Sequence, residues 1–237
     1  MSDDAEADAT GEVDVGDDSE GWRGETPDGW PVPIRGVTES VVATLGPNDL
    51  WNVAALGLHA PDPADDESAE GDSTDGTTET AHVTATTWGR TRTYRNFRRQ
   101  GGGVVQFVTD PRDFVDAALT IREESEPVLA SADAWVAVTV EEIDSGESGG
   151  TEWTEWRLEP TDSAVERRGV RTINRGFAAV IDATVAVSRL DVDAYDTEVL
   201  LDRLAYFAET VEKCGGPAER EAFETIDEVS DWRSRRS

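Results

Sequence analysis

Residues 34–59 alternate between apolar and polar side chains in two runs, which predicts two β-strands. In the first run, 37–45, alternate side chains can face a core while the others point away from it. A turn-forming cluster, Gly-Pro-Asn-Asp at 46–49, separates it from the second run at 51–58. The pattern therefore predicts a β-hairpin.

Later runs of β-branched and aromatic residues predict more strands, at 82–87, 104–108, 135–140 and 153–158. The acidic stretch 141–150 separates the last two and is interpreted as a turn. Together with the hairpin, these strands predict a small antiparallel barrel interrupted by helices.

Capping residues mark two helices between the strands. A short helix is predicted at 93–100, with Thr93 as its N-cap and the glycines that follow as its end. Asp110 and Pro111 are the residue types that favour an N-cap and a first helical position, so a second helix is predicted there.

The last third of the chain has a helical pattern. Ser163 and Glu166 have the spacing of a capping box, which predicts a helix start after Pro160. Residues 171–190 fit both periods, and their length favours a helix over a strand. Two amphipathic helices follow, opened by Asp196 and by Pro217.

The chain has 51 acidic and 21 basic residues and a net charge of −30, and Lys213 is its only lysine. Such a composition is typical of a surface kept hydrated at high salt, so we expect a protein of a salt-rich cytoplasm. Without a large basic face, it argues against nucleic-acid binding. No apolar run is long enough to span a membrane, and no signal peptide is recognisable.

Two acidic segments are poor in large apolar side chains and are not expected to join a core. Residues 1–32 are predicted to be a disordered tail, and residues 61–80 a solvated loop inserted between two strands. The rest is predicted to form a barrel domain over 33–159 and a helical subdomain over 160–232.

A basic, hydroxyl-rich island at 86–97 is the main candidate for ligand chemistry. Three hydrogen-bonding side chains surround the predicted helix start: Thr91, Thr93 and Asn96. Three arginines accompany them: Arg90, Arg92 and Arg95. Free amides, the positive end of a helix dipole and forked guanidinium groups favour an anion such as phosphate. The alternative is an ordinary surface helix whose arginines balance neighbouring acids.

The return strand of the hairpin contains the small residues Ala54, Ala55 and Gly57. They leave room for a flat ligand against the backbone, although tight sheet packing explains them equally well. His59 and His82 lack a cysteine or carboxylate at ligand spacing, so no metal site is predicted. No acid–base or nucleophilic constellation stands out, and the catalytic residues stay unknown.

Four motifs, in this order and spacing, resemble those of a mostly archaeal family known as domain of unknown function 447. They are Asn-x-Ala-Ala-x-Gly at 52–57, Thr-x-Thr-x-x-Asn-Phe at 91–97, Val-Val-Gln-Phe-Val-Thr-Asp-Pro at 104–111 and Asn-Arg-Gly-Phe-Ala-Ala-Val-Ile-Asp at 174–182. The family looks like a branch of the FMN-binding split β-barrel superfamily, related to flavin reductases. The resemblance implies an α+β fold: a split antiparallel β-barrel that binds flavin, with a C-terminal helical subdomain.

The resemblance also implies roles for individual residues. The phosphate of FMN is expected at the 91–96 turn, and the isoalloxazine ring is expected beside Asn52, Ala54, Ala55 and Gly57. Thr91 replaces the usual serine and keeps its hydroxyl, whereas Ala55 replaces the usual proline and leaves the path of the strand less defined. Trp88 and Tyr94 either flank the ring or pack in the core.

A further family signature falls on Asn174 and Arg175, which fit either a ligand contact or a helix start. The resemblance implies a homodimer as well, with one flavin per subunit near the interface. Three hypotheses for function follow: an FMN-binding protein acting as a flavin-dependent oxidoreductase or flavin reductase, a similar barrel that binds a deazaflavin coenzyme, or a non-catalytic scaffold for a phosphate-bearing ligand or a dimer.

Overall fold

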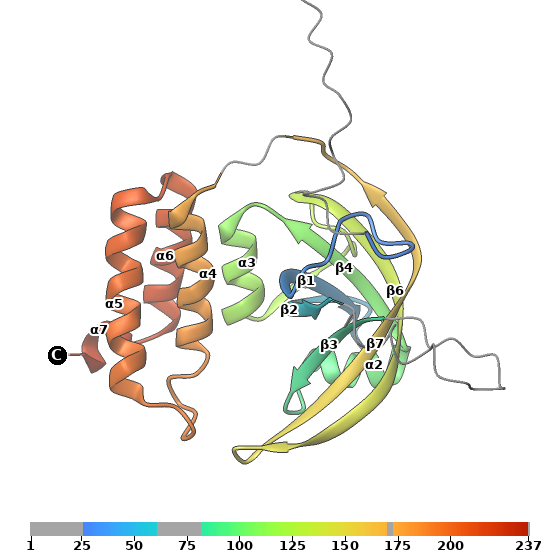
Figure 1. The fold of residues 1–237 in the computed structure, drawn as a ribbon, viewed down its shortest axis with the longest axis horizontal. Helices are drawn as coiled ribbons and strands as arrows, with labels where there is room; N and C mark the ends of the chain where they lie inside the picture. The colour runs from blue at the N-terminus through green and yellow to red at the C-terminus, as the bar shows by residue number, and fades with distance from the viewer. Residues whose placement is uncertain (1–25, 61–81, 170–172, 237) are drawn as a thin grey trace, which may run out of the picture.

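A closed β-barrel stands beside a layer of helices in the computed structural model (Figure 1), which describes residues 26–60, 82–169 and 173–236. The predicted 61–80 loop and most of the predicted tail lie outside these residues. The α+β architecture, with a barrel followed by C-terminal helices, is confirmed.

Six antiparallel strands form the barrel: β1 Val37–Leu45, β2 Trp51–His59, β3 Val83–Trp88, β4 Gly102–Val108, β6 Ala132–Ser148 and β7 Thr151–Val165. Their order around the barrel is β1-β4-β6-β7-β3-β2, and β2 closes it by pairing with β1. The short strand β5, Arg122–Glu124, pairs with the beginning of β2.

The predicted hairpin is confirmed, since β1 and β2 pair in register from Val37 opposite His59 to Leu45 opposite Trp51. Its two faces have different neighbours because side chains alternate along a strand. Val42 and Leu58 belong to the core inside the barrel. Side chains of the other face, Val41 and Ala43 among them, pack outside the barrel.

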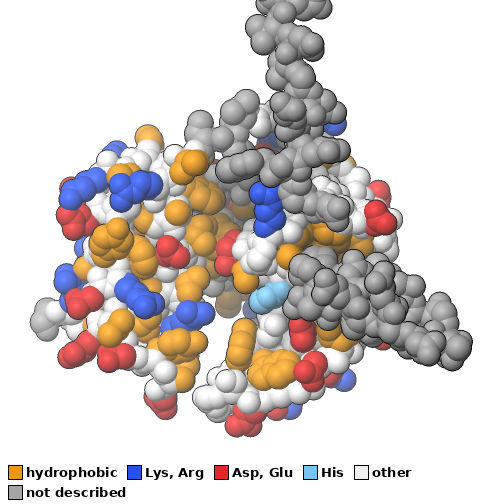
Figure 2. All heavy atoms as spheres, in the orientation of Figure 1, with side chains coloured by type: hydrophobic (Ala, Val, Ile, Leu, Met, Phe, Trp, Pro, Cys, Tyr) orange, Lys and Arg blue, Asp and Glu red, His pale blue; other side chains and the backbone are white. Residues whose placement is uncertain are grey.

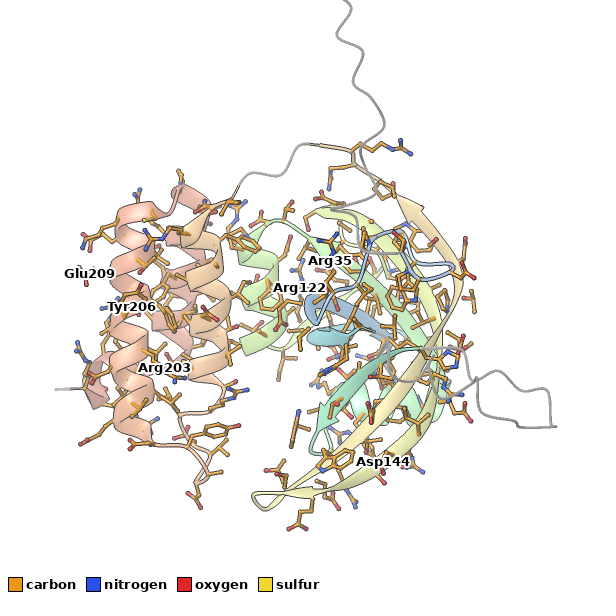
Figure 3. The ribbon with its side chains drawn as sticks, viewed as in Figure 1. Arg35, Arg122, Asp144, Arg203, Tyr206 and Glu209 are labelled. Carbon is orange, nitrogen blue, oxygen red and sulfur yellow. The ribbon has the colours of Figure 1, made fainter. Side chains whose placement is uncertain are left out.

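The predicted turn at 141–150 is wrong. Strand β6 continues to Ser148, and the turn is only Gly149-Gly150, both with positive φ. Cross-strand hydrogen bonds form whether or not the side chains are buried, so the acidic residues extend the hairpin beyond the barrel as a polar arm. Figure 3 shows Asp144 on this arm.

The helix start predicted at Ser163 is also wrong, because β7 runs through Pro160 to Val165. Residues 160–165 therefore belong to the barrel sheet, where they pair with the beginning of β6. The division of the chain into domains stays a prediction.

The helices are α2 Arg92–Gln100, α3 Pro111–Leu119, α4 Arg175–Val187, α5 Thr197–Cys214, α6 Pro217–Val229 and α7 Trp232–Arg235. Within the ambiguous segment 171–190, residues 175–187 are thus helical, and Asp196 caps α5 as predicted. Helices α4, α5 and α6 share a core that includes Val180, Leu204 and Ile226. The ring of Phe97 on α2 lies in the barrel core, 5.3 Å from that of Trp156.

Helix α3 joins the two cores, because it lies between α4 and the barrel (Figure 1). Asp110 caps it, as predicted, by accepting a hydrogen bond from the Arg112 amide. Phe114 packs against the outside of β1 and β2, whereas Val115 joins the helical core. Arg122 of β5 lies close to α3 (Figure 3) and pairs with Asp113, which fixes the helix to the sheet.

Candidate functional site

A groove of about 330 Å³ lies between the outside of the barrel and the helices. In Figure 2 the surface is hollowed between the helical unit on the left and the barrel on the right. Four elements besides β1 contribute most of its lining residues: Ala54 and Ala55 of β2, Thr86 and Trp88 of β3, Phe114 and Ala118 of α3, and Thr184 and Val185 of α4. Its volume falls in the lower range for small-molecule sites.

The start of α2 forms one end of this groove. The N-cap is Thr91, whose hydroxyl accepts a hydrogen bond from the Tyr94 amide at 3.2 Å, so the predicted cap at Thr93 is wrong. Gly89, with a φ of 67°, turns the chain so that the helix begins two residues earlier than expected. Arg92 and Thr93 thereby occupy the first two helical positions, whose amides have no acceptor within the helix.

Thr93 combines burial with an unused hydrogen-bonding group. It lines the groove and is only 6% exposed. Its hydroxyl has no hydrogen-bond partner among the described residues, and the first turn of α2 contains no acidic side chain. Free amides, a helix dipole and a free hydroxyl at one point favour a bound anion.

Arg90 and Arg95 differ in what they offer such an anion. The Arg90 guanidinium is paired with Glu152, 3.0 Å away, and lines a different hollow beside the β6–β7 arm. Arg95 donates from Nε to the Thr91 carbonyl at 3.3 Å, so its guanidinium lies next to the N-cap. Of these two, Arg95 is therefore the better placed to meet an anion at the helix start.

Asn96 and Asn52 are buried, and neither lines the groove. The Asn96 amide donates to the Thr44 hydroxyl at 2.9 Å and so attaches α2 to β1. Asn52 lies opposite Thr44 in the β1–β2 register. Both residues thus lie where α2 is attached to the sheet.

Asn174 and Arg175 lie at the opposite end of α4 from the residues that line the groove. The Asn174 side chain caps α4 by accepting from the Gly176 amide at 2.8 Å, and it donates to Glu219 at 2.9 Å. Thr184 follows ten residues later, roughly 15 Å along the helix axis. Asn174 thereby ties the start of α4 to α6.

The structure thus brings together four of the predicted residues in the groove: Ala54, Ala55, Thr91 and Thr93. It places six others outside the lining: Asn52, Gly57, Arg90, Asn96, Asn174 and Arg175. Sequence reasoning missed the wall formed by α3 and α4, because local periodicity shows that a helix has an apolar face but not what the face meets.

Glu39 of β1 also lines the groove and was missed. Its side chain lies on the same face of β1 as those of Val37, Val41 and Ala43. A charged residue among these apolar positions was the signal that could have identified it. Burial raises the pKa of its carboxyl, and the nearby negative charge of Asp182 raises it further, while His59 acts in the opposite direction.

The two aromatic residues beside the helix start behave differently. Tyr94 packs against the barrel core, with its ring 6.0 Å from that of Trp156. Trp88 lines the groove and is 54% exposed, so much of its indole is open to a ligand.

Other features of the described residues do not add to this site. A hollow of about 640 Å³ between α5, α6 and α7 is lined by none of the predicted residues. Within 26–60, 82–169 and 173–236, no helix is long and apolar enough to cross a membrane. In the same ranges, no three His, Cys, Asp or Glu side chains are grouped so as to hold a metal ion.

Comparison with known proteins gives matches over most of the chain. Residues 38–167 match the N-terminal domain of a protein family of unknown function, DUF447, and residues 174–228 match a second DUF447 domain. No curated protein matches the chain.

Solved structures give further matches. The chain is similar to an FMN-bound DUF447 protein from Methanosarcina mazei, with 24% identity and a TM-score of 0.64 over 83% of this chain and 97% of that one. It also matches the styrene monooxygenase flavin reductase of Pseudomonas putida S12, with 12% identity and a TM-score of 0.33 over 56% of this chain and 81% of that one. A third match is nitrilotriacetate monooxygenase component B from Bacillus cereus, with 13% identity and a TM-score of 0.36 over 66% and 80%.

Proposed function

This chain belongs to the DUF447 family, and we propose that it is an FMN-binding protein whose cofactor lies in the groove between the barrel and the helices. One observation carries the proposal: a helix start with a buried, unpartnered hydroxyl opens into the same groove as small strand residues. The FMN bound to the relative from Methanosarcina mazei supports the choice of ligand.

The residues of the groove fit the two chemically different parts of FMN. The phosphate would be held by the free amides of Arg92 and Thr93, the Thr93 hydroxyl and the Arg95 guanidinium. The ring system would lie against β2 at Ala55, whose short side chain is on the outer face of the sheet with that of Val41 and admits a flat group, with Trp88 beside it.

Bound FMN would supply electron transfer, since redox chemistry belongs to the cofactor and the protein binds and orients it. The chain's own contribution would be to fix the phosphate and to shield one side of the ring with α3 and α4. We infer that the activity to test is that of a flavin-dependent oxidoreductase.

The test is a titration of the full chain with FMN in concentrated salt, followed by visible absorbance and tryptophan fluorescence. We expect saturable binding with quenching of the exposed Trp88. Ala55→Leu should fill the groove and weaken binding at least about tenfold, whereas Ala178→Leu, on an exposed position of α4, should not. Equal affinities in all three proteins would place FMN elsewhere, and no binding would reject the proposal.

Two additional measurements separate the related hypotheses. Competition with a deazaflavin coenzyme decides which ring system the groove prefers, and tighter binding of that coenzyme would replace FMN in the proposal. Turnover with nicotinamide donors tests the enzymatic role, since FMN bound without turnover on any donor would leave a binding protein only.

The homodimer expected from the resemblance is a separate proposal. Sedimentation equilibrium in the presence and absence of FMN tests it directly. A monomer that binds FMN with full affinity would show that one chain completes the site.

A further inference from the structure

Glu39 is the only charged residue among those that line the groove in the described part of the chain. It lies opposite Gly57 in the β1–β2 register, so no side chain of β2 stands beside it on that face. Its neighbours in the same register of β1, Val41 and Ala43, are fully buried in the apolar contact outside the barrel. Glu39 itself is exposed, so its carboxyl group stands at the open edge of this apolar contact, where it lines the groove.

The surroundings of Glu39 do not stabilise its charge. Burial raises the pKa of its carboxyl, and the negative charge of Asp182 on α4 acts in the same direction, against the opposing effect of His59. Its carboxyl oxygens also have no hydrogen bond to another described residue. Glu39 is exposed without a ligand, and a ligand lying over it would displace water from the carboxyl, so an N–H donor of that ligand would replace the lost hydration.

Glu39 and the helix start line the groove from different elements, β1 and α2. Asn96 attaches α2 to Thr44 near the end of β1, with 2.9 Å between the amide nitrogen and the hydroxyl oxygen. Glu39 precedes Thr44 by five residues, which is about 17 Å along an extended strand. The groove thus offers anion-binding groups on α2 and a hydrogen-bond acceptor on β1.

FMN carries complementary groups, namely a phosphate at one end and a ring-edge imide N–H, at N3, on the flavin. We propose that the Glu39 carboxyl accepts this N3–H hydrogen bond and thereby selects a ring that presents a donor at that edge. The inference rests on the proposed binding of FMN in this groove, and it adds a residue that recognises the ring.

The test compares FMN with 3-methyl-FMN, which keeps the phosphate and the ring but lacks the N3 proton. Wild-type protein should bind FMN at least about tenfold more tightly, the effect of one hydrogen bond to a charged group. Glu39→Leu should abolish that preference, whereas Glu39→Gln, which still offers a carbonyl acceptor, should keep part of it. Glu147→Leu removes an equal charge from the exposed β6–β7 arm and should leave the preference unchanged.

The outcomes separate this inference from the proposed function. Equal binding of FMN and 3-methyl-FMN by the wild type would overturn the role of Glu39 and leave FMN binding intact. A preference for FMN that survives in Glu39→Leu would also overturn the role of Glu39, because another contact would then discriminate against the methyl group. Thermal melting of each variant checks folding, and failure of the wild type to bind either flavin would reject the proposed function itself.

Discussion

Thr91 and Thr93 are two residues apart, yet the structure gives their hydroxyls different tasks. The Thr91 hydroxyl caps α2, whereas the Thr93 hydroxyl faces the groove without a partner. Replacement of each by valine, which keeps the shape and removes the hydroxyl, should therefore separate folding from ligand binding.

The expected sizes follow from these contacts. Thr91→Val removes an N-cap, which costs about 1 kcal/mol of unfolding free energy. In a chain of this size that lowers the melting temperature by roughly 2–4 °C. Thr93→Val removes no bond within the described protein, so its melting temperature should stay within about 1 °C of the wild type. Loss of a hydrogen bond to phosphate, about 1.5–3 kcal/mol, should weaken FMN binding by about 10- to 150-fold.

The assay is thermal melting without ligand and FMN titration, both at one high salt concentration. Thr225→Val on α6 is a matched control, because its hydroxyl bonds only within its own helix, to the Glu221 carbonyl. If Thr93→Val melts several degrees lower while its affinity for FMN is unchanged, the Thr93 hydroxyl is structural and the phosphate site is misplaced.

Three other variants test the fold around the groove. Phe97→Ala should cost about 3–5 kcal/mol in urea unfolding, because its ring is 1% exposed and packs on Trp156; a loss below 1 kcal/mol would contradict this packing. The hydrogen bond from Arg112 lowers the pKa of Asp110, so this carboxylate stabilises the fold above its ordinary pKa and less as pH falls through the acidic range. The stability difference between wild type and Asp110→Asn should accordingly shrink on acidification, and a constant difference would count against the ion pair. Asn174→Ala should lose about 1 kcal/mol of stability as a cap is removed, with FMN affinity unchanged; weaker binding would favour the ligand contact.

Sequence patterns predicted the parts of the fold whose determinants lie within a few residues. The β1–β2 hairpin follows from strand alternation on both sides of one turn cluster, and its register is confirmed. Asp110 and Asp196 cap α3 and α5 as predicted, because a cap needs only its own side chain and the next amides.

Features that depend on distant contacts could not be predicted in this way. Charge at 141–150 indicated exposure, but cross-strand pairing extends that exposed segment as an arm. The N-cap at Thr91 depends on the preceding turn at Gly89, and two threonines of equal capping propensity compete for the role. The groove wall requires α4 to fold back on the barrel, which no local pattern around Thr184 encodes.

Closure of the barrel has a consequence for how the chain folds. The β1–β2 hairpin is local, but β3 completes its pairing only with β7, where Val83 lies opposite Leu158. During synthesis, β3 therefore keeps an unpaired edge until the ribosome has released β7, which ends at Val165. Pairings so distant in sequence slow folding and expose strand edges to aggregation. We therefore expect a chain stopped before β7 to aggregate, whereas one stopped after Val165 can close its barrel.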